Sequence, residues 1–220
     1  MFRLFLFLLI TFLSSAAFPQ DTVNQVNTLG KKQGFWRKHD SLGRLVYEDY
    51  FKDGSPIGTF RYYYPSGEIK TISTLSENAR HASVVTYFQN GQKMASGIYL
   101  NEKKESIWRF FSEKDGSLVS EESYQSGVKN GYSKVFFPEG GLADSTWYRK
   151  GKMDGWSEQY YSDGKLKVQT FYRNGEKNDT FHTYYMTGQI MSSGQYINDH
   201  PSGRWFYYTE KGEVIRTEDY

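Results

Sequence analysis

The chain of 220 residues contains no cysteine and only 5 prolines. Without cysteine it can form no disulfide, no thiolate metal site and no bacterial lipoprotein anchor. Its 27 Lys and Arg nearly balance its 25 Asp and Glu, so it lacks the strongly basic surface that an electrostatic nucleic-acid binder needs. A sustained hydrophobic period of 3.6 is also missing, and we therefore predict no helix in the mature chain.

One long apolar run occurs, at residues 4–13. Arg3 precedes the run and small residues follow it at 15–17, an order typical of a secretory signal peptide. A run of about ten residues is too short for a membrane-spanning helix, which needs about 20. We therefore predict a signal peptide over 1–17, an unstructured linker over 18–29, no permanent membrane span, and export to the periplasm, the cell surface or the medium.

The residues in excess are glycine (21), tyrosine (19) and phenylalanine (16). The glycines recur as G-x-x-x-G, and the second position of this pattern, here called the marker, returns every 24 residues and once after 25. The marker positions are Gly34, Gly58, Ala82, Ser106, Gly131, Gly155, Asp179 and Gly203. Such a period predicts one repeat domain over 30–220. Its eight units are bounded at 30–53, 54–77, 78–101, 102–126, 127–150, 151–174, 175–198 and 199–220.

Each unit contains two strand-like runs separated by a turn signal. In the sixth unit these runs are WSEQYY and KLKVQTFY. Asp163-Gly164 lies between them, and this dipeptide predicts a type I′ turn with Asp163 and Gly164 as its two loop residues. Another glycine-bearing turn leads to the next unit. We therefore predict an all-β fold: an elongated single antiparallel meander of about sixteen strands, built from eight stacked β-hairpin repeats and roughly 75 Å long.

The predicted pairing sorts the side chains into two faces, because they alternate along a strand. The main packing face is expected to carry three rows. The first stands two residues after the marker: Trp36, Phe60, Val84, Trp108, Phe181 and Trp205. The second comprises Leu45, Ile69, Leu118, Leu142, Leu166, Ile190 and Val214. The third closes the units: Tyr99, Tyr124, Tyr148, Tyr172, Tyr196 and Tyr220. We expect the marker glycine to lie opposite the closing tyrosine and to leave space for its ring, and Phe181 opposite Gly194 to be a second such pair.

The other face is expected to be mostly polar, with one aromatic row. Five residues after the marker stand Tyr63, Tyr87, Phe111, Phe136, Tyr160, Tyr184 and Tyr208, here called the ladder. On every second strand they form rungs about 9–10 Å apart. Two interpretations stay open. Either a β-bulge turns the ladder into the packing face or its rings pack along the sheet, or it is a binding surface, since exposed aromatic stripes mark interaction sites.

The unit G-x-x-x-G-x-W-x-x-Y-Y-x-x-G-x-L resembles the bacterial variant of the MORN repeat, found in proteins often assigned to the YwqK-like antitoxin family. GKMDGWSEQYYSDGKL and GVKNGYSKVFFPEGGL match it best, while the third and fourth units lose their first two glycines. The resemblance covers 30–220. It implies an elongated sheet of stacked hairpins that acts as a scaffold for proteins or membranes, without an agreed chemistry.

No catalytic constellation emerges from the sequence. His39, His81, His182 and His200 stand at unrelated positions of the repeat, so we predict no metal site, no cofactor and no enzyme. Three functions remain. The first is a non-catalytic scaffold that mediates protein–protein interaction in the cell envelope. The second is a module that binds an envelope polysaccharide, with sugar rings stacked on the ladder, and the third is an antitoxin or immunity protein with one dedicated partner.

Overall fold

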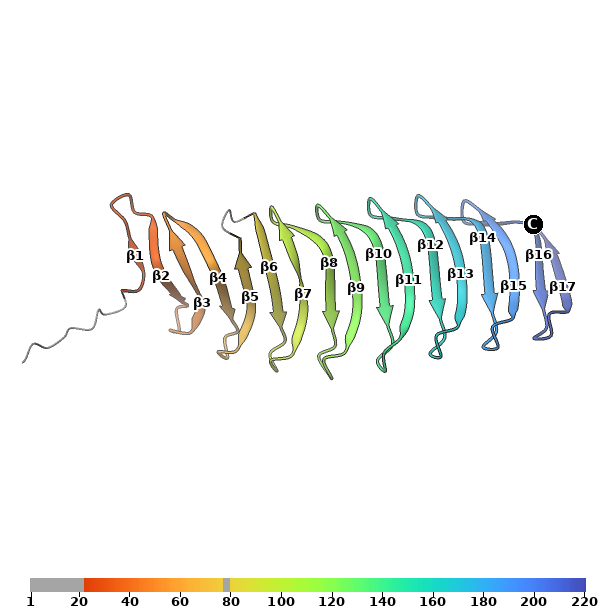
Figure 1. The fold of residues 1–220 in the computed structure, drawn as a ribbon, viewed down its shortest axis with the longest axis horizontal. Helices are drawn as coiled ribbons and strands as arrows, with labels where there is room; N and C mark the ends of the chain where they lie inside the picture. Colours follow the sequence, from red (N-terminus) through yellow and green to blue (C-terminus); the bar gives the residue numbers. More distant parts are fainter. Residues whose placement is uncertain (1–21, 77–79) are drawn as a thin grey trace, which may run out of the picture.

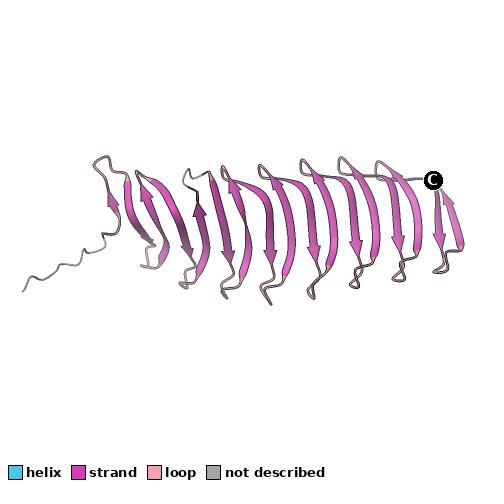
Figure 2. Ribbon diagram, in the orientation of Figure 1, coloured by secondary structure: helices cyan, strands magenta, loops and turns pink. Residues whose placement is uncertain are grey.

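The computed structural model describes residues 22–76 and 80–220. Within them the chain forms one antiparallel β-sheet and no helix (Figure 2). The strands are β1 (Gln25–Val26), β2 (Lys32–His39), β3 (Leu45–Lys52), β4 (Ser55–Tyr63), β5 (Ile69–Leu75), β6 (His81–Tyr87), β7 (Lys93–Leu100), β8 (Lys103–Phe111), β9 (Leu118–Gln125), β10 (Val128–Phe136), β11 (Leu142–Arg149), β12 (Lys152–Tyr160), β13 (Leu166–Arg173), β14 (Glu176–Tyr184), β15 (Ile190–Ile197), β16 (His200–Tyr208) and β17 (Val214–Asp219).

Each strand pairs with the next one along the chain, so the sheet is a meander. β1 and β17 lie at opposite ends of an elongated, open sheet (Figure 1). The predicted fold class is therefore confirmed, with 17 strands in place of about sixteen.

The additional strand, β1, lies in the predicted linker. Its Gln25 pairs with Gln33 of β2. Just before it, the backbone N–H of Asn24 donates to the carbonyl of Phe35 (2.9 Å), and the Asn24 side chain accepts from the backbone N–H of Arg37 (2.8 Å). These bonds cover part of the edge of β2, which would otherwise present unpaired backbone groups. The expectation of an unstructured linker is therefore wrong for residues 24–26, while 1–21 lie outside the described residues.

The turn inside each hairpin is of another type than predicted. Inside the sixth hairpin, Gly164 N–H donates to Tyr161 C=O (2.9 Å), and Gly164 (φ 84°) alone among the loop residues 162–164 has a positive φ. This is a type I turn followed by a glycine bulge, not a type I′ turn. The turns at the opposite edge of the sheet, which connect one hairpin to the next, have two central residues with positive φ, for example Asn174 (φ 53°) and Gly175 (φ 98°). The type I′ geometry therefore joins successive hairpins.

A β-bulge changes the predicted pairing beside each hairpin turn. Gly155 pairs with Tyr172 as expected. The predicted two-residue loop would also place Lys167 opposite Tyr160, but the register shifts before Tyr160, which pairs with Leu166. A shift of one residue moves a side chain to the opposite face of the sheet. The row that contains Leu166 was therefore predicted on the wrong face: it lies with the ladder. We call this face B, and face A is the one that carries Trp108 and the closing tyrosines.

A second bulge explains the marker glycine. Thr146 pairs with Ser157 and Tyr148 with Met153, so β12 has two residues more than β11 over this span. Gly155 lies inside the bulge with φ 144°, and a Cβ atom on it would fall 3.1 Å from Trp147, not against the closing tyrosine. The expectation that the marker makes space for that ring is wrong, because the backbone conformation is what requires glycine.

Within residues 22–76 and 80–220 no second layer covers the sheet, and its most buried rings lie on face A. Trp108 is 3% exposed and Trp205 is 6% exposed. Each indole lies directly over a glycine of the preceding strand, because a Cβ on Gly97 or Gly194 would fall within 2.3 Å of the ring. Phe181 does pair with Gly194, as predicted. These large rings supply the apolar burial that a single sheet otherwise lacks.

Candidate binding surfaces

The ladder residues are half-buried on face B. Tyr160 lies opposite Leu166, and its hydroxyl donates to Glu158 (2.7 Å). Burial, together with this bond, raises the pKa of Tyr160 to about 12. Tyr63 makes the same bond to Glu48 (2.7 Å). The ladder therefore contributes to packing along the sheet, and its role as a binding surface stays a prediction.

Face B carries a second aromatic row that the sequence analysis missed. It consists of Tyr132, Trp147, Trp156 and Phe171 on the consecutive strands β10 to β13, and we call it the exposed row. Tyr132 is 51% exposed and Trp156 is 40% exposed. The rings form two edge-to-face pairs, Tyr132 with Trp147 (centroids 4.7 Å apart) and Trp156 with Phe171 (5.1 Å). Large rings held in fixed pairs and open to solvent are typical of an interaction surface.

Polar side chains lie between the exposed row and the ladder. Lys134 Nζ stands 5.7 Å from the Tyr132 ring centroid, and Gln169 donates to Glu158 (2.9 Å). Beyond β10 the apolar character continues on face B at Ile107, which is 42% exposed. The signal that could have identified this surface is the residue directly after the marker, where Tyr132 and Trp156 stand.

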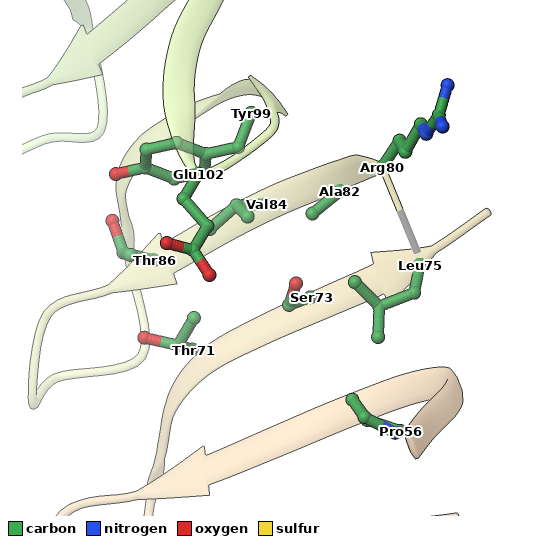
Figure 3. A pocket seen from close by; sticks show the side chains of 10 residues that line it. All are labelled: Pro56, Thr71, Ser73, Leu75, Arg80, Ala82, Val84, Thr86, Tyr99 and Glu102. Carbon is green, nitrogen blue, oxygen red and sulfur yellow. The ribbon is translucent and has the colours of Figure 1, made fainter. Parts of the chain in front are cut away.

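Face A has a hollow over β4 to β7 and the turn that follows β7, with a volume of about 720 Å³ (Figure 3). Its lining residues are Pro56, Thr71, Ser73, Leu75, Arg80, Ala82, Val84, Thr86, Tyr99 and Glu102. This volume and the mixture of apolar side chains with a few polar ones are usual for a ligand site. In Figure 3 the Arg80 guanidinium points away from the other lining side chains, whereas the Glu102 carboxylate points toward the residues of the floor.

The hollow exists because small side chains replace rings at two positions of face A. Val84 and Thr86 in β6 stand where β8 has Trp108 and Phe110. The pairing of β5 with β6 also differs from its neighbours: it has no bulge, and the marker Ala82 is absent from the residues with positive φ. The third unit is therefore the place where both the backbone and the side chains depart from the repeat.

Cations cover the rings on either side of this hollow. Lys104 Nζ lies 4.6 Å from the Trp108 ring and 4.9 Å from the Tyr124 ring. Lys32 Nζ lies 4.4 Å from Phe51, on the other side. These contacts stabilise a charged group over aromatic faces. They show that the flanking parts of face A are already filled by the chain's own side chains.

The described residues contain no group of three His, Cys, Asp or Glu side chains that could hold a metal ion. The four histidines lie on different strands: His39 in β2, His81 in β6, His182 in β14 and His200 in β16. Burial lowers the pKa of His182, whose Nδ1 is buried without a partner. Across the part of the chain that the structure describes, no helix is long and apolar enough to cross a membrane.

Two segments of the chain match a family described as "MORN repeat variant", residues 56–75 and 153–174. They coincide with the hairpins β4–β5 and β12–β13. The chain therefore contains MORN-type repeats within a meander of hairpins, while the count of eight units and the YwqK-like family stay predictions.

The chain matches none of the curated proteins. Among solved structures it is similar to the one described as "Crystal Structure of TarM", with 14% sequence identity and a TM-score of 0.27. The similarity covers 51% of this chain and 19% of that chain, so it spans about a fifth of the other protein. At this TM-score the likeness carries no argument about function.

Proposed function

We propose that the chain is a non-catalytic repeat scaffold that binds a protein partner in the cell envelope through the exposed row of face B. The observation that carries this proposal is the exposure of Trp156 and Tyr132 on a sheet that no other described part of the chain covers. Rings needed only for the fold would be covered, as Trp108 is. Trp and Tyr are also the residues that most often dominate the binding energy of protein interfaces.

The MORN-type repeats support the scaffold part of the proposal, because stacked units create a long surface from local contacts. The envelope part rests on the signal peptide expected from residues 1–17, which lie outside the described residues. The non-catalytic part rests on the chemistry of the surface, since the exposed row presents rings and a few paired polar groups.

The test compares two double variants of the full exported chain. Tyr132→Ser with Trp156→Ser removes the exposed row, and Tyr160→Ser with Tyr184→Ser removes two ladder rungs as a matched control. Each chain is used to capture partners from an envelope extract by cross-linking and mass spectrometry, and affinity for the captured protein is then measured with purified components.

We expect the exposed-row variant to bind about 10- to 100-fold more weakly, with little change in melting temperature. The ladder variant should lose stability instead, because the rings that it removes pack against Leu166 and Ile190. Equal binding by the exposed-row variant and the unmodified chain would contradict the proposed surface. Retention on envelope polysaccharide, with no protein captured, would contradict the proposed class of partner.

A further inference from the structure

The hollow on face A has an internal counterpart in which it is filled. Strands β14 to β16 repeat the arrangement of β6 to β8: Gly194 lies under Trp205 as Gly97 lies under Trp108. The residue paired with that glycine is Phe181 in β14 and Val84 in β6. Phe181 packs against Trp205 with ring centroids 5.3 Å apart. The hollow is thus the place where one copy of the repeat supplies a ring and the other does not.

Glu102 gives the hollow a hydrogen-bond acceptor. It stands in the turn between β7 and β8 with φ 63°, a conformation that glycine adopts in the corresponding turns at Gly54 and Gly127. The matching acid near the C-terminus, Asp199 (φ 67°), accepts from the backbone N–H of Lys177 (2.7 Å) and so serves the fold. Within the described residues, Glu102 makes no such bond, and its carboxylate points toward the floor of the hollow (Figure 3). The carboxylate of Glu102 is thus left available to accept a hydrogen bond from a ligand in the hollow.

The floor itself combines apolar and hydroxyl groups. Ser73 pairs across the strands with Val84, and Thr71 pairs with Thr86. Val84 is buried, and the hydroxyls of Thr71 and Ser73 make no hydrogen bond within the described residues. The edge of the site is formed by the ring of Tyr99. A ligand that suits this floor has a flat apolar ring and a polar end.

The chain shows repeatedly how it binds such a group. Its own tyrosines rest on a strand with the hydroxyl donated to a glutamate: Tyr63 to Glu48, Tyr160 to Glu158 and Tyr220 to Glu218, all at 2.7 Å. Hydrogen bonds from a hydroxyl to a carboxylate are among the stronger ones in proteins.

We propose that the hollow on face A binds a tyrosine side chain of a partner protein, with its ring in the place of the missing phenylalanine and its hydroxyl donated to Glu102. This inference rests on the proposed function in one respect only, that the natural ligand is a protein. The site is separate from the exposed row, which lies on the opposite face of the sheet. A partner that uses both faces would clamp the sheet near its middle.

The test uses a defined probe rather than an unidentified partner. N-acetyl-tyrosinamide and N-acetyl-phenylalaninamide are titrated into the full exported chain, and backbone NMR shifts are followed. We expect saturable shifts at Thr71, Ser73 and Thr86 with a dissociation constant on the order of a millimolar for the tyrosine probe. The phenylalanine probe should bind roughly tenfold more weakly, because it lacks the hydroxyl that Glu102 accepts.

Two variants make the site testable without loss of the fold. Val84→Phe recreates the arrangement of Phe181 over Gly194, so it should raise the melting temperature by about 2–4 °C and abolish the shifts. Glu102→Gly relieves the backbone strain and should also stabilise the chain, while the preference for tyrosine over phenylalanine disappears. Stabilisation together with loss of binding is a result that a purely structural role cannot give.

The proposal is overturned if the tyrosine probe gives no saturable shifts, if Val84→Phe binds it as well as the unmodified chain does, or if methyl glucoside binds more tightly than the tyrosine probe. None of these results would affect the exposed row, whose variants are measured separately with the captured partner. Conversely, weak binding by the exposed-row variant would leave the tyrosine titration unchanged. The two proposals can therefore fail independently.

Discussion

The region from β2 to β9 and the region from β10 to β13 use the same repeat but place their tryptophans on opposite faces. In the first region Trp108 lies on face A, over Gly97, and is almost fully buried. In the second, Trp156 lies on face B and is 40% exposed. The two tryptophans differ by a single position relative to the marker, two residues after it for Trp108 and one for Trp156. One step along a strand thus decides whether the ring is buried on face A or exposed on face B.

On face A of β10 to β13, small polar side chains take the place that tryptophans have in the first region. Thr146 and Thr170 are buried there at 4% and 5% exposure. The Thr146 hydroxyl is hydrogen-bonded to the Ser157 hydroxyl (2.9 Å). Small hydrogen-bonded side chains therefore hold β10 to β13 together on face A, without a tryptophan on that face.

The largest expected effect comes from truncating the two tryptophans. Trp108→Ala should lower the free energy of unfolding by about 3–5 kcal/mol, because it empties the space over Gly97. Trp156→Ala should cost about 1 kcal/mol, chiefly its edge-to-face contact with Phe171. Urea unfolding followed by circular dichroism measures both. Similar losses at the two sites would show that the exposed row is part of the core, contrary to the proposed function.

The second prediction concerns the pH dependence of stability that comes from Asp49, a buried carboxyl group in β3. Asp49 is 1% exposed, and burial raises its pKa to about 6, against the opposing backbone bond from Tyr50 and the nearby charge of Lys32. The Asp49 carboxyl releases its proton near pH 4 in the unfolded chain and near pH 6 in the folded chain, so the folded chain binds the proton more tightly. The stabilisation is therefore complete below about pH 4 and is lost as the pH rises through 6, a change of about 3 kcal/mol.

Melting curves between pH 4 and pH 8 measure this dependence, with Asp49→Asn as the control. The asparagine variant should flatten the profile in that window, because it replaces a titrating group with a neutral one of similar shape. A profile that Asp49→Asn leaves unchanged would assign the pH dependence to another group.

The repeat itself, the meander and the all-β fold could be predicted because they depend on a period of 24 residues and on local turn signals. The faces could be predicted only in part. Counting back from Gly164 gives the wrong pairing at Leu166, because the loop has three residues and not two. It gives the correct pairing at Tyr172, because the bulge at Lys167 restores the register. The hollow could not be predicted either. It is the space that Val84 leaves empty where the corresponding position in β14 has the ring of Phe181, and a missing ring gives no positive signal in the sequence.

The smallest effect tests the two kinds of marker position. Gly155→Val should cost about 2 kcal/mol, because valine disfavours φ 144° and its Cβ would crowd Trp147. Ala82→Val is the matched control in the unit without a bulge. There the backbone is regular and the side chain borders the hollow, so the change should stay below about 0.5 kcal/mol. Thermal melts of both variants measure the difference. A loss at Ala82→Val as large as that at Gly155→Val would mean that the third unit needs its small marker as strictly as the sixth does. The hollow would then have to be attributed to packing around the marker and not to the missing ring at Val84.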